Sequence, residues 1–221
     1  MESKKNMRDS YSTQIFRVDG KNSFMEVLNI AFPIGKVQFN FVEYDEKTNK
    51  QTKKLDIYMD ALQAVALAER ILSGDFATMV QNAKTSGKFN GMNVTTYTSF
   101  FTDMGGISEE KVAKKLEDYQ KQYPFVKEGQ AISRQFKIQT GSKYPWVLRA
   151  EYGPGKSSDT GLIVPQGNAP VYINLPVDAD SFYKMAVAIK YSYQAYLNQY
   201  YAKFGDKLFP NEKVKIFTPG K

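Results

Sequence analysis

Hydrophobic and polar residues alternate along several short stretches of the chain, and this alternation predicts strands. The pattern is clearest over residues 36–44, where Val37, Phe39 and Phe41 are separated by polar residues. Such a pattern is typical of an antiparallel strand with one buried face and one polar face. In the same half of the chain, alternation also predicts strands at residues 11–18, 24–32 and 54–59.

A helix is expected directly after the last of these strands. Asp60 can cap its first turn, and Gly74 ends it after Ser73, in agreement with the residue preferences at helix ends. A second helix is expected over residues 76–84. The apolar stripe predicted for the first helix consists of Ala61, Leu62, Val65, Ala68 and Leu72.

The second half of the chain predicts the same order of strands, turn, strand and helix. The hydrophobic residues of the helix expected after Asp60 match those of the long helix expected at 180–204 at one constant offset in the sequence. This match indicates an internal repeat, and chance similarity is the alternative. We therefore expect an α+β fold of two ββββα repeats, at residues 11–90 and 91–205, with antiparallel sheets packed against helices. A flexible tail is expected at residues 1–10, and a C-terminal tail at residues 206–221, in which residues 210–221 could form a short docking segment. In the second half a strand is expected at residues 94–101, and Met104-Gly105-Gly106 is expected to interrupt the chain after it. An inserted surface helix capped by Ser108 is expected at 109–122, followed by strands at 131–139, 145–152 and 170–175 and a glycine-rich turn at 153–160. A long helix is expected at 180–204, which Asp178 or Asp180 caps and Gly205 ends.

The composition removes the commonest catalytic side chains. The chain contains no Cys and no His, which excludes disulfides, thiolate chemistry, Ser-His-Asp catalysis and most zinc sites. The pairs Asp56/Asp60 and Asp178/Asp180 could support carboxylate-only or metal–carboxylate catalysis, but helix capping is the simpler explanation. Residues 155–157 read Gly-Lys-Ser without the glycine spacing of a P-loop. We therefore expect no enzymatic activity, no cofactor and no metal.

The charge of the chain favours an anionic partner. The formal net charge is +7 and the isoelectric point is about 9.2, which attracts nucleic acids through a long-range field. Residues 1–9 lack the apolar core of a signal peptide, and no apolar run approaches the length of a membrane span. We expect a soluble, cytoplasmic protein without a membrane partner.

Basic and aromatic residues are interleaved on several of the predicted strands. Such a sheet suits single-stranded nucleic acid, because bases stack on exposed rings while Lys and Arg contact phosphates. Lys137 and Arg149 are expected on the outward face of adjacent strands, where their removal should weaken binding and hardly alter stability. The alternative, which applies above all to rings such as Phe136 and Trp146, is that the aromatic residues fill the core. The predicted binding residues are Lys36, Tyr44, Lys53, Lys54, Tyr58, Arg134, Lys137, Lys143, Tyr144, Trp146, Arg149, Tyr152 and Lys156.

The strand at residues 171–175, the short polar turn after it and the helix at 182–201 resemble the close of a Whirly domain. In that family two ββββα repeats form one domain, and PC4-type coactivators and PUR repeats share the unit. The resemblance implies binding of single-stranded DNA or RNA across the sheets and oligomerisation through the helices. Residues 34–37 lie where Whirly proteins carry a Lys-Gly-Lys-rich motif, and the helix at 109–122 is an addition to the family's pattern.

These observations together predict a non-enzymatic, largely sequence-independent single-stranded DNA-binding protein. We expect it to act in DNA processing, such as replication, recombination or transfer of a mobile element, with RNA as the alternative ligand. We also expect a homo-oligomer formed through the C-terminal helix. The competing hypothesis is a structural or partner-docking protein that uses the tyrosine-rich helix at residues 180–204.

Overall fold

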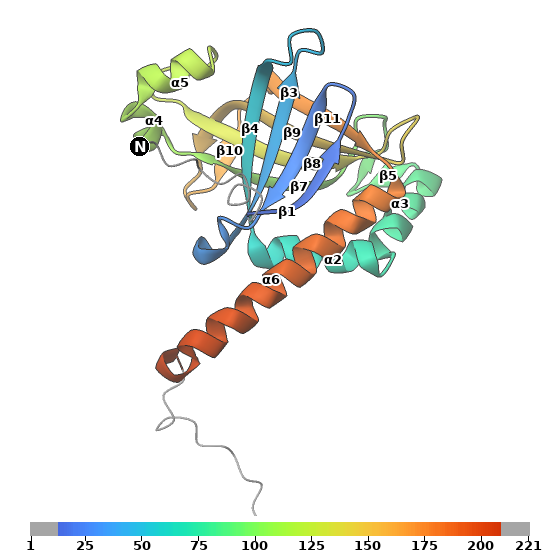
Figure 1. The fold of residues 1–221 in the computed structure, drawn as a ribbon. Coiled ribbons are helices and arrows are strands. Elements are labelled where there is room, and N and C mark those ends of the chain that lie inside the picture. Colours follow the sequence, from blue (N-terminus) through green and yellow to red (C-terminus); the bar gives the residue numbers. More distant parts are fainter. Residues whose placement is uncertain (1–12, 209–221) are drawn as a thin grey trace, which may run out of the picture.

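The first half of the described chain forms a four-stranded antiparallel sheet. The computed structural model describes residues 13–208 (Figure 1), so the predicted tail at 1–10 and residues 209–221 lie outside the described part. The strands predicted in this half are confirmed with shifted ends: the second ends at Leu28, the fourth begins at Gln51, and residues 11 and 12 of the first lie outside the described part. Residues 32–34 form the short 3-10 helix η1 (Phe32–Ile34). The sheet has the order β1 (Gln14–Asp19), β2 (Ser23–Leu28), β3 (Lys36–Tyr44) and β4 (Gln51–Asp60).

Two helices, α2 (Ala61–Leu72) and α3 (Asp75–Ser86), follow β4. Asp60 caps α2 as expected, because its side chain accepts hydrogen bonds from backbone N–H groups of the first turn. The predicted apolar stripe is confirmed for Ala61 and Ala68, which are buried, and for Val65 and Leu72, which pack against the core; it is wrong for Leu62, which is 68% exposed. The sequence interpretation missed Ala64, Leu67 and Ile71, which are buried. The buried face of α2 is rotated relative to the predicted stripe, because α2 packs against the helix α6 (Ala179–Leu208) as well as against the strands β3 and β4.

The second half of the described chain forms a five-stranded antiparallel sheet. A small hairpin of β5 (Lys88–Phe89) and β6 (Met92–Asn93) leads into it. Two short helices, α4 (Glu109–Ala113) and α5 (Leu116–Gln122), lie between its first two strands, where a single helix was predicted. Ser108 makes no side-chain capping bond to α4. The sheet consists of β7 (Ser99–Ile107), β8 (Ala131–Gln139), β9 (Trp146–Ser157), β10 (Ile163–Pro165) and β11 (Val171–Val177), in which β9 pairs with β8, β10 and β11.

The predicted boundaries of β7 are wrong at both ends. Residues 95–98 form a turn, closed by a hydrogen bond from the Thr98 backbone N–H to the Thr95 carbonyl, so the strand begins only after it. Gly105 and Gly106 continue the strand that they were expected to interrupt. A Cβ on Gly106 would lie 2.2 Å from the carbonyl oxygen of Ile132, so the strand needs glycine there to pair closely with β8.

The glycine-rich segment after residue 152 is also strand rather than turn. β9 continues to Ser157 and pairs there with both β8 and β10. A Cβ on Gly155 would lie 2.8 Å from the Ile163 side chain and 2.9 Å from the Ser133 backbone nitrogen. The glycine therefore allows the close approach of β10, and the predicted turn at 153–160 is replaced by a strand with a short connection after it.

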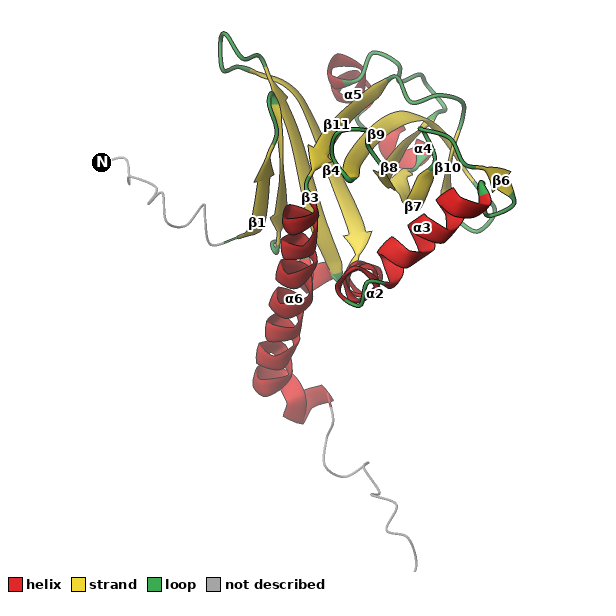
Figure 2. Cartoon of the chain, turned by 90° about the vertical axis from the view of Figure 1, so that its right-hand side faces the viewer, coloured by secondary structure: helices red, strands yellow, loops and turns green. Residues whose placement is uncertain are grey.

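The helix α6 closes the described chain and extends beyond Gly205, its expected end. Asp178 begins it, because its carboxylate accepts a hydrogen bond of 2.6 Å from the Ser181 backbone N–H. Phe182, Met185 and Ile189 on one face of the helix are buried, whereas Tyr200, which helical spacing places on the same face, is 38% exposed. Figure 2 shows that α6 passes α2 and that its C-terminal part extends away from both sheets.

The two sheets pack against each other through their apolar faces. Phe39 on β3 and Phe136 on β8 are fully buried, and their ring centroids lie 4.9 Å apart in a stacked arrangement. The Tyr152 hydroxyl on β9 accepts a hydrogen bond from the Asp56 backbone N–H at 2.9 Å and donates one to the Asp56 carbonyl. Both backbone groups of Asp56, on the edge strand β4, therefore have a hydrogen-bond partner. The fold is therefore α+β with antiparallel sheets and a C-terminal helix. Within residues 13–208, no helix combines the length and the apolar character needed to cross a membrane.

Candidate nucleic-acid interface

Three of the predicted binding residues, Lys36, Tyr58 and Arg134, line one cleft of about 340 Å³ between the two sheets. Lys36 begins β3 and Tyr58 lies near the end of β4, while Arg134 comes from β8 in the other half of the chain. The Tyr58 side chain is 43% exposed, so part of its ring is accessible beside the cleft. The fold thus brings two cations and an aromatic ring together from segments that are far apart in the sequence.

The walls of this cleft carry charges of both signs. Asp103 on β7 is only 7% exposed, and the Lys36 ammonium lies 3.5 Å from an Asp60 carboxylate oxygen. Burial raises the pKa of Asp103 to about 6; nearby Lys36 and a hydrogen bond from Gln63 lower it, and the Asp60 charge raises it further. Burial also raises the pKa of Tyr58. The cleft therefore combines cationic donors with one buried carboxylate whose protonation changes close to neutral pH.

Arg134 is held in place by a ring rather than by an acid. Its guanidinium carbon lies 4.7 Å from the centroid of the Tyr152 ring, within the range of a cation–π contact. Its Nε–H is buried and makes no hydrogen bond within the described residues. A buried donor without an acceptor is unfavourable for the fold.

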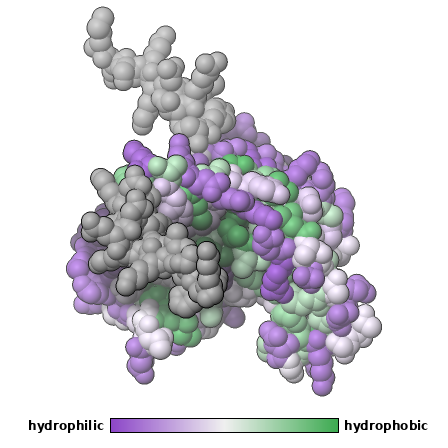
Figure 3. Space-filling view, turned by 90° about the horizontal axis from the view of Figure 1, so that it is seen from below, coloured by the Kyte–Doolittle hydropathy of each residue, from purple (hydrophilic) through white to green (hydrophobic). Residues whose placement is uncertain are grey.

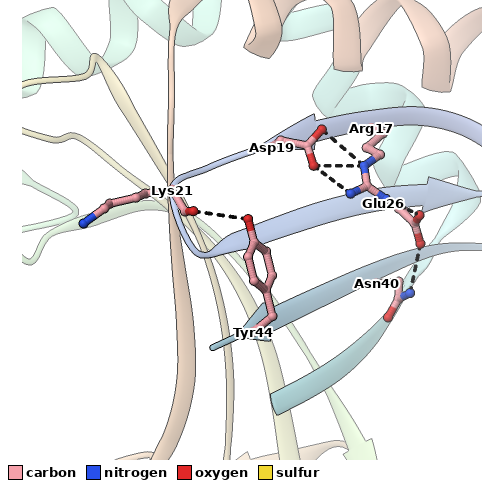
Figure 4. Close-up of polar contacts among 6 residues, drawn as sticks. All are labelled: Arg17, Asp19, Lys21, Glu26, Asn40 and Tyr44. Atoms are coloured by element: carbon pink, nitrogen blue, oxygen red, sulfur yellow. Dashed lines mark hydrogen bonds and ion pairs between the residues drawn. The ribbon is translucent and has the colours of Figure 1, made fainter. Parts of the chain in front are cut away.

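The outer face of the first sheet continues from the cleft and is polar, but it neutralises much of its own charge. Figure 4 shows Arg17, Glu26 and Asn40 in a row across three neighbouring strands. Arg17 donates to Glu26 at 3.1 Å and to Asp19 at 2.7 Å, and Asn40 donates to the other Glu26 oxygen at 3.1 Å. Arg17 is therefore committed to two carboxylates and is a weak candidate for phosphate contacts.

The outer face of the second sheet carries a three-residue ion cluster. Lys137 and Arg149 lie opposite each other on β8 and β9, as predicted. Both contact Glu151, whose side chain is only 6% exposed, whereas Lys137 and Arg149 are 22% and 21% exposed. Arg149 also donates to Asn174 at 3.0 Å and lies 4.1 Å from the centroid of the Tyr172 ring. The two cations are partners of a buried carboxylate, so the expectation of freely exposed charges is wrong.

The other predicted polar and aromatic residues are spread over separate surfaces. Tyr144 is 41% exposed and lines a second cleft of about 720 Å³ together with Arg17 and Lys21. The Tyr44 hydroxyl donates to the Lys21 carbonyl at 3.1 Å (Figure 4). Two lysines form ion pairs: the Lys53 ammonium lies 2.8 Å from a Glu43 carboxylate oxygen and the Lys54 ammonium 3.7 Å from an Asp56 carboxylate oxygen. The Lys143 ammonium lies 5.9 Å from the Tyr144 ring centroid, and Lys156 is exposed on β9.

Two aromatic residues of the predicted set belong to the core. Tyr152 is 1% exposed and bonds to the β4 edge through its hydroxyl, so its ring cannot stack on a base. Trp146 is 9% exposed, and its ring stacks on Phe182 of α6 at a centroid distance of 4.7 Å. Both are removed from the candidate interface, because the packing of the sheets and of α6 covers them.

The sequence interpretation missed the acidic and small residues of the cleft. Asp103 lies in a stretch of hydrophobic and β-branched residues, and a charged residue at such a position is a signal for a special role. Gly105 was interpreted as an interruption, although it lines the cleft. Gln63 on α2 also lines the cleft and was not selected from the sequence.

Comparison of the chain with protein-family models, with curated proteins and with solved structures finds no match. Within residues 13–208, no group of three or more Asp and Glu side chains gathers in a way that could hold a metal ion.

Proposed function

We propose that the protein binds single-stranded DNA, largely independently of sequence and without catalysing a reaction, in a cytoplasmic DNA-processing system. The observation that carries this proposal is the cleft in which the cations Lys36 and Arg134 lie with the partly exposed ring of Tyr58. A base can stack on Tyr58 while the cations contact neighbouring phosphates, and each stacked base contributes about 1–3 kcal/mol. RNA offers the same rings and phosphates and is the alternative ligand.

The order of elements supports a duplicated unit, which we propose as the origin of the fold. The segment β1-β2-β3-β4-α2 is followed by β7-β8-β9-β11-α6, so each half consists of four strands and a helix. In this interpretation α3, the β5–β6 hairpin, α4, α5 and β10 are additions. The same ββββα unit, used twice, is the basis of the resemblance to Whirly domains.

Substitution of Tyr58 by alanine tests the proposed binding site. The variant should bind a labelled oligo(dT) about tenfold more weakly, since one stacked base is lost, and its salt dependence should be unchanged. Lys36→Ala should instead flatten the salt dependence, since one phosphate contact is lost. The matched control is Tyr97→Ala, because Tyr97 is 83% exposed at the opposite end of β7. Equal losses in the Tyr58 and Tyr97 variants would argue against the site.

A second candidate function, partner docking through α6, is favoured by the rings exposed on this helix. Tyr183, Tyr191 and Tyr201 are 49%, 57% and 47% exposed, and the helix extends away from the sheets (Figure 2). The same side of the molecule, seen from below in Figure 3, shows hydrophobic residues among hydrophilic ones. A surface helix of a monomer is usually polar away from its buried stripe. These rings therefore support a second buried contact, and a second copy of the chain is the partner that we propose.

The mass in solution tests this docking surface. A homo-oligomer should have a light-scattering mass above the chain mass of 25.1 kDa at micromolar concentration. The double variant Tyr183→Glu, Val187→Glu should dissociate it and retain the fold, as judged by circular dichroism. A monomeric wild-type protein would confine α6 to contacts within one chain.

A further inference from the structure

We propose that the cleft around Asp103 is a guanine-selective slot for one unpaired base, an inference that rests on the proposed binding of single strands. The rest of the strand would be bound without regard to sequence, and a guanine would be held in this slot more tightly than the other bases.

The space for the base is created by a missing side chain. Gly105 pairs with Arg134 across β7 and β8, and a Cβ built on Gly105 would meet nothing within 4 Å. Asp103 lies two residues earlier on β7 and therefore points to the same side of the sheet as this empty position. The cleft of about 340 Å³ is at the lower end of the range for small-molecule sites, which fits one base.

The polar groups of the cleft match the edge of guanine. An ionised carboxylate only accepts hydrogen bonds, and guanine presents two adjacent donors, N1–H and the N2 amino group. Adenine and cytosine place a ring acceptor beside their amino donor, and thymine flanks its single donor with two carbonyl oxygens, so each would be repelled by Asp103. Guanine O6 and N7 are acceptors, and the side chains of Lys36 and Arg134, which line the cleft, carry the donors for them.

The location of the slot is consistent with a bound strand. Tyr58 is partly exposed and also lines the cleft, so a base stacked on it would be a neighbour of the base in the slot. Bases of single strands are commonly recognised by stacking combined with hydrogen bonds to their edges. Asp103 is buried and makes no salt bridge within the described residues, and this arrangement is unfavourable for the fold alone.

The test compares labelled oligo(dT) with the same oligonucleotide carrying one central dG, dA, dC or deoxyinosine at pH 7.5. The dG oligonucleotide should bind about tenfold more tightly than oligo(dT), in the range of one bidentate base contact. Deoxyinosine lacks the N2 amino group and should lose most of this gain. Equal affinity for all of these oligonucleotides would refute the slot alone, whereas no binding of any of them would also refute the proposed function.

The variant Asp103→Asn should abolish the preference for dG, so that it binds the dG oligonucleotide and oligo(dT) with equal affinity. The charge-matched control is Glu117→Gln, on α5 and exposed, which should keep the preference. In the wild-type protein the preference should also shrink between pH 7.5 and pH 5, as Asp103 becomes protonated. Asp60, Lys36, Tyr58 and Arg134 face the same cleft, and the Asp103→Asn variant retains them all. A pH effect of equal size in the Asp103→Asn variant would contradict the assignment of the dG preference to Asp103. If this variant does not fold, the comparison of dG with deoxyinosine in the wild-type protein decides whether the slot selects guanine.

Discussion

Removal of both Lys137 and Arg149 should destabilise the protein strongly. The two side chains enclose the carboxylate of Glu151, which is 6% exposed. In a double variant with methionine at both positions, this carboxylate would remain buried without a cation. Loss of the partner of a buried charge costs about 3–5 kcal/mol. Because the two cations are themselves about one-fifth exposed, water can reach the cluster, and we expect a loss of about 3 kcal/mol, the lower end of that range.

Two further variants separate the cost of the buried charge from ordinary packing effects. Glu151→Gln should cost only about 1 kcal/mol, since the remaining cations can extend to solvent on their aliphatic stems. The triple variant, with methionine at 137 and 149 and glutamine at 151, should recover most of the stability lost in the double variant, since no charge is left unpaired. The control is Lys114→Met, whose ion pair with Glu110 is exposed and should contribute little.

Urea unfolding, followed by circular dichroism, measures the free energy of unfolding of each variant. A double variant within about 0.5 kcal/mol of the wild type would refute the reasoning, because that is the size of an ordinary surface substitution. The same result would restore the simpler expectation that Lys137 and Arg149 are free to contact phosphates. Any binding test on this double variant has to be made below its unfolding transition.

Three other substitutions have expected effects on the free energy of unfolding. Asp103→Asn should stabilise the protein by about 1–2 kcal/mol at pH 7.5. Burial raises the pKa of Asp103 in the folded protein to about 6, so its ionised form is unfavourable there, and water at the open side of the cleft screens part of this cost. This gain should fade as the pH falls through 6 towards 4, where Asp103 is protonated in the fold, and a gain that grew towards pH 4 would contradict the sign. Tyr152→Phe should cost about 1–3 kcal/mol in urea unfolding, because the Asp56 backbone groups on β4 lose their partner. Gly106→Ala should cost at least about 2 kcal/mol, because its Cβ would lie 2.2 Å from the Ile132 carbonyl oxygen; a melting temperature equal to that of the wild type would show that β7 can shift.

The elements that the sequence predicted correctly depend on local signals. The cap at Asp60 and the alternation at Val37, Phe39 and Phe41 concern neighbouring residues only, and both are confirmed. The errors occur where distant segments decide the outcome. Gly106 and Gly155 were interpreted as breaks because glycine is common in turns, whereas here they allow other strands to approach closely.

The candidate site was only partly predictable for the same reason. Lys36, Tyr58 and Arg134 were all selected from their residue types, but nothing local indicates that β8 carries Arg134 to the end of β4. The burial of Trp146 by α6 depends on the docking of a helix more than thirty residues further along the chain. Asp103 acquires its importance only from the packing of the two sheets.

The most direct test of the central claim is the fluorescence anisotropy of labelled single-stranded and double-stranded oligonucleotides of equal length over a salt series. We expect the single strand to bind more tightly, since stacking needs unpaired bases. The logarithm of its affinity should fall with the logarithm of salt concentration with a slope of about −1.4, as for contacts of the two cations Lys36 and Arg134 with phosphates. Equal or tighter binding of the duplex, or no binding at low salt, would contradict the account.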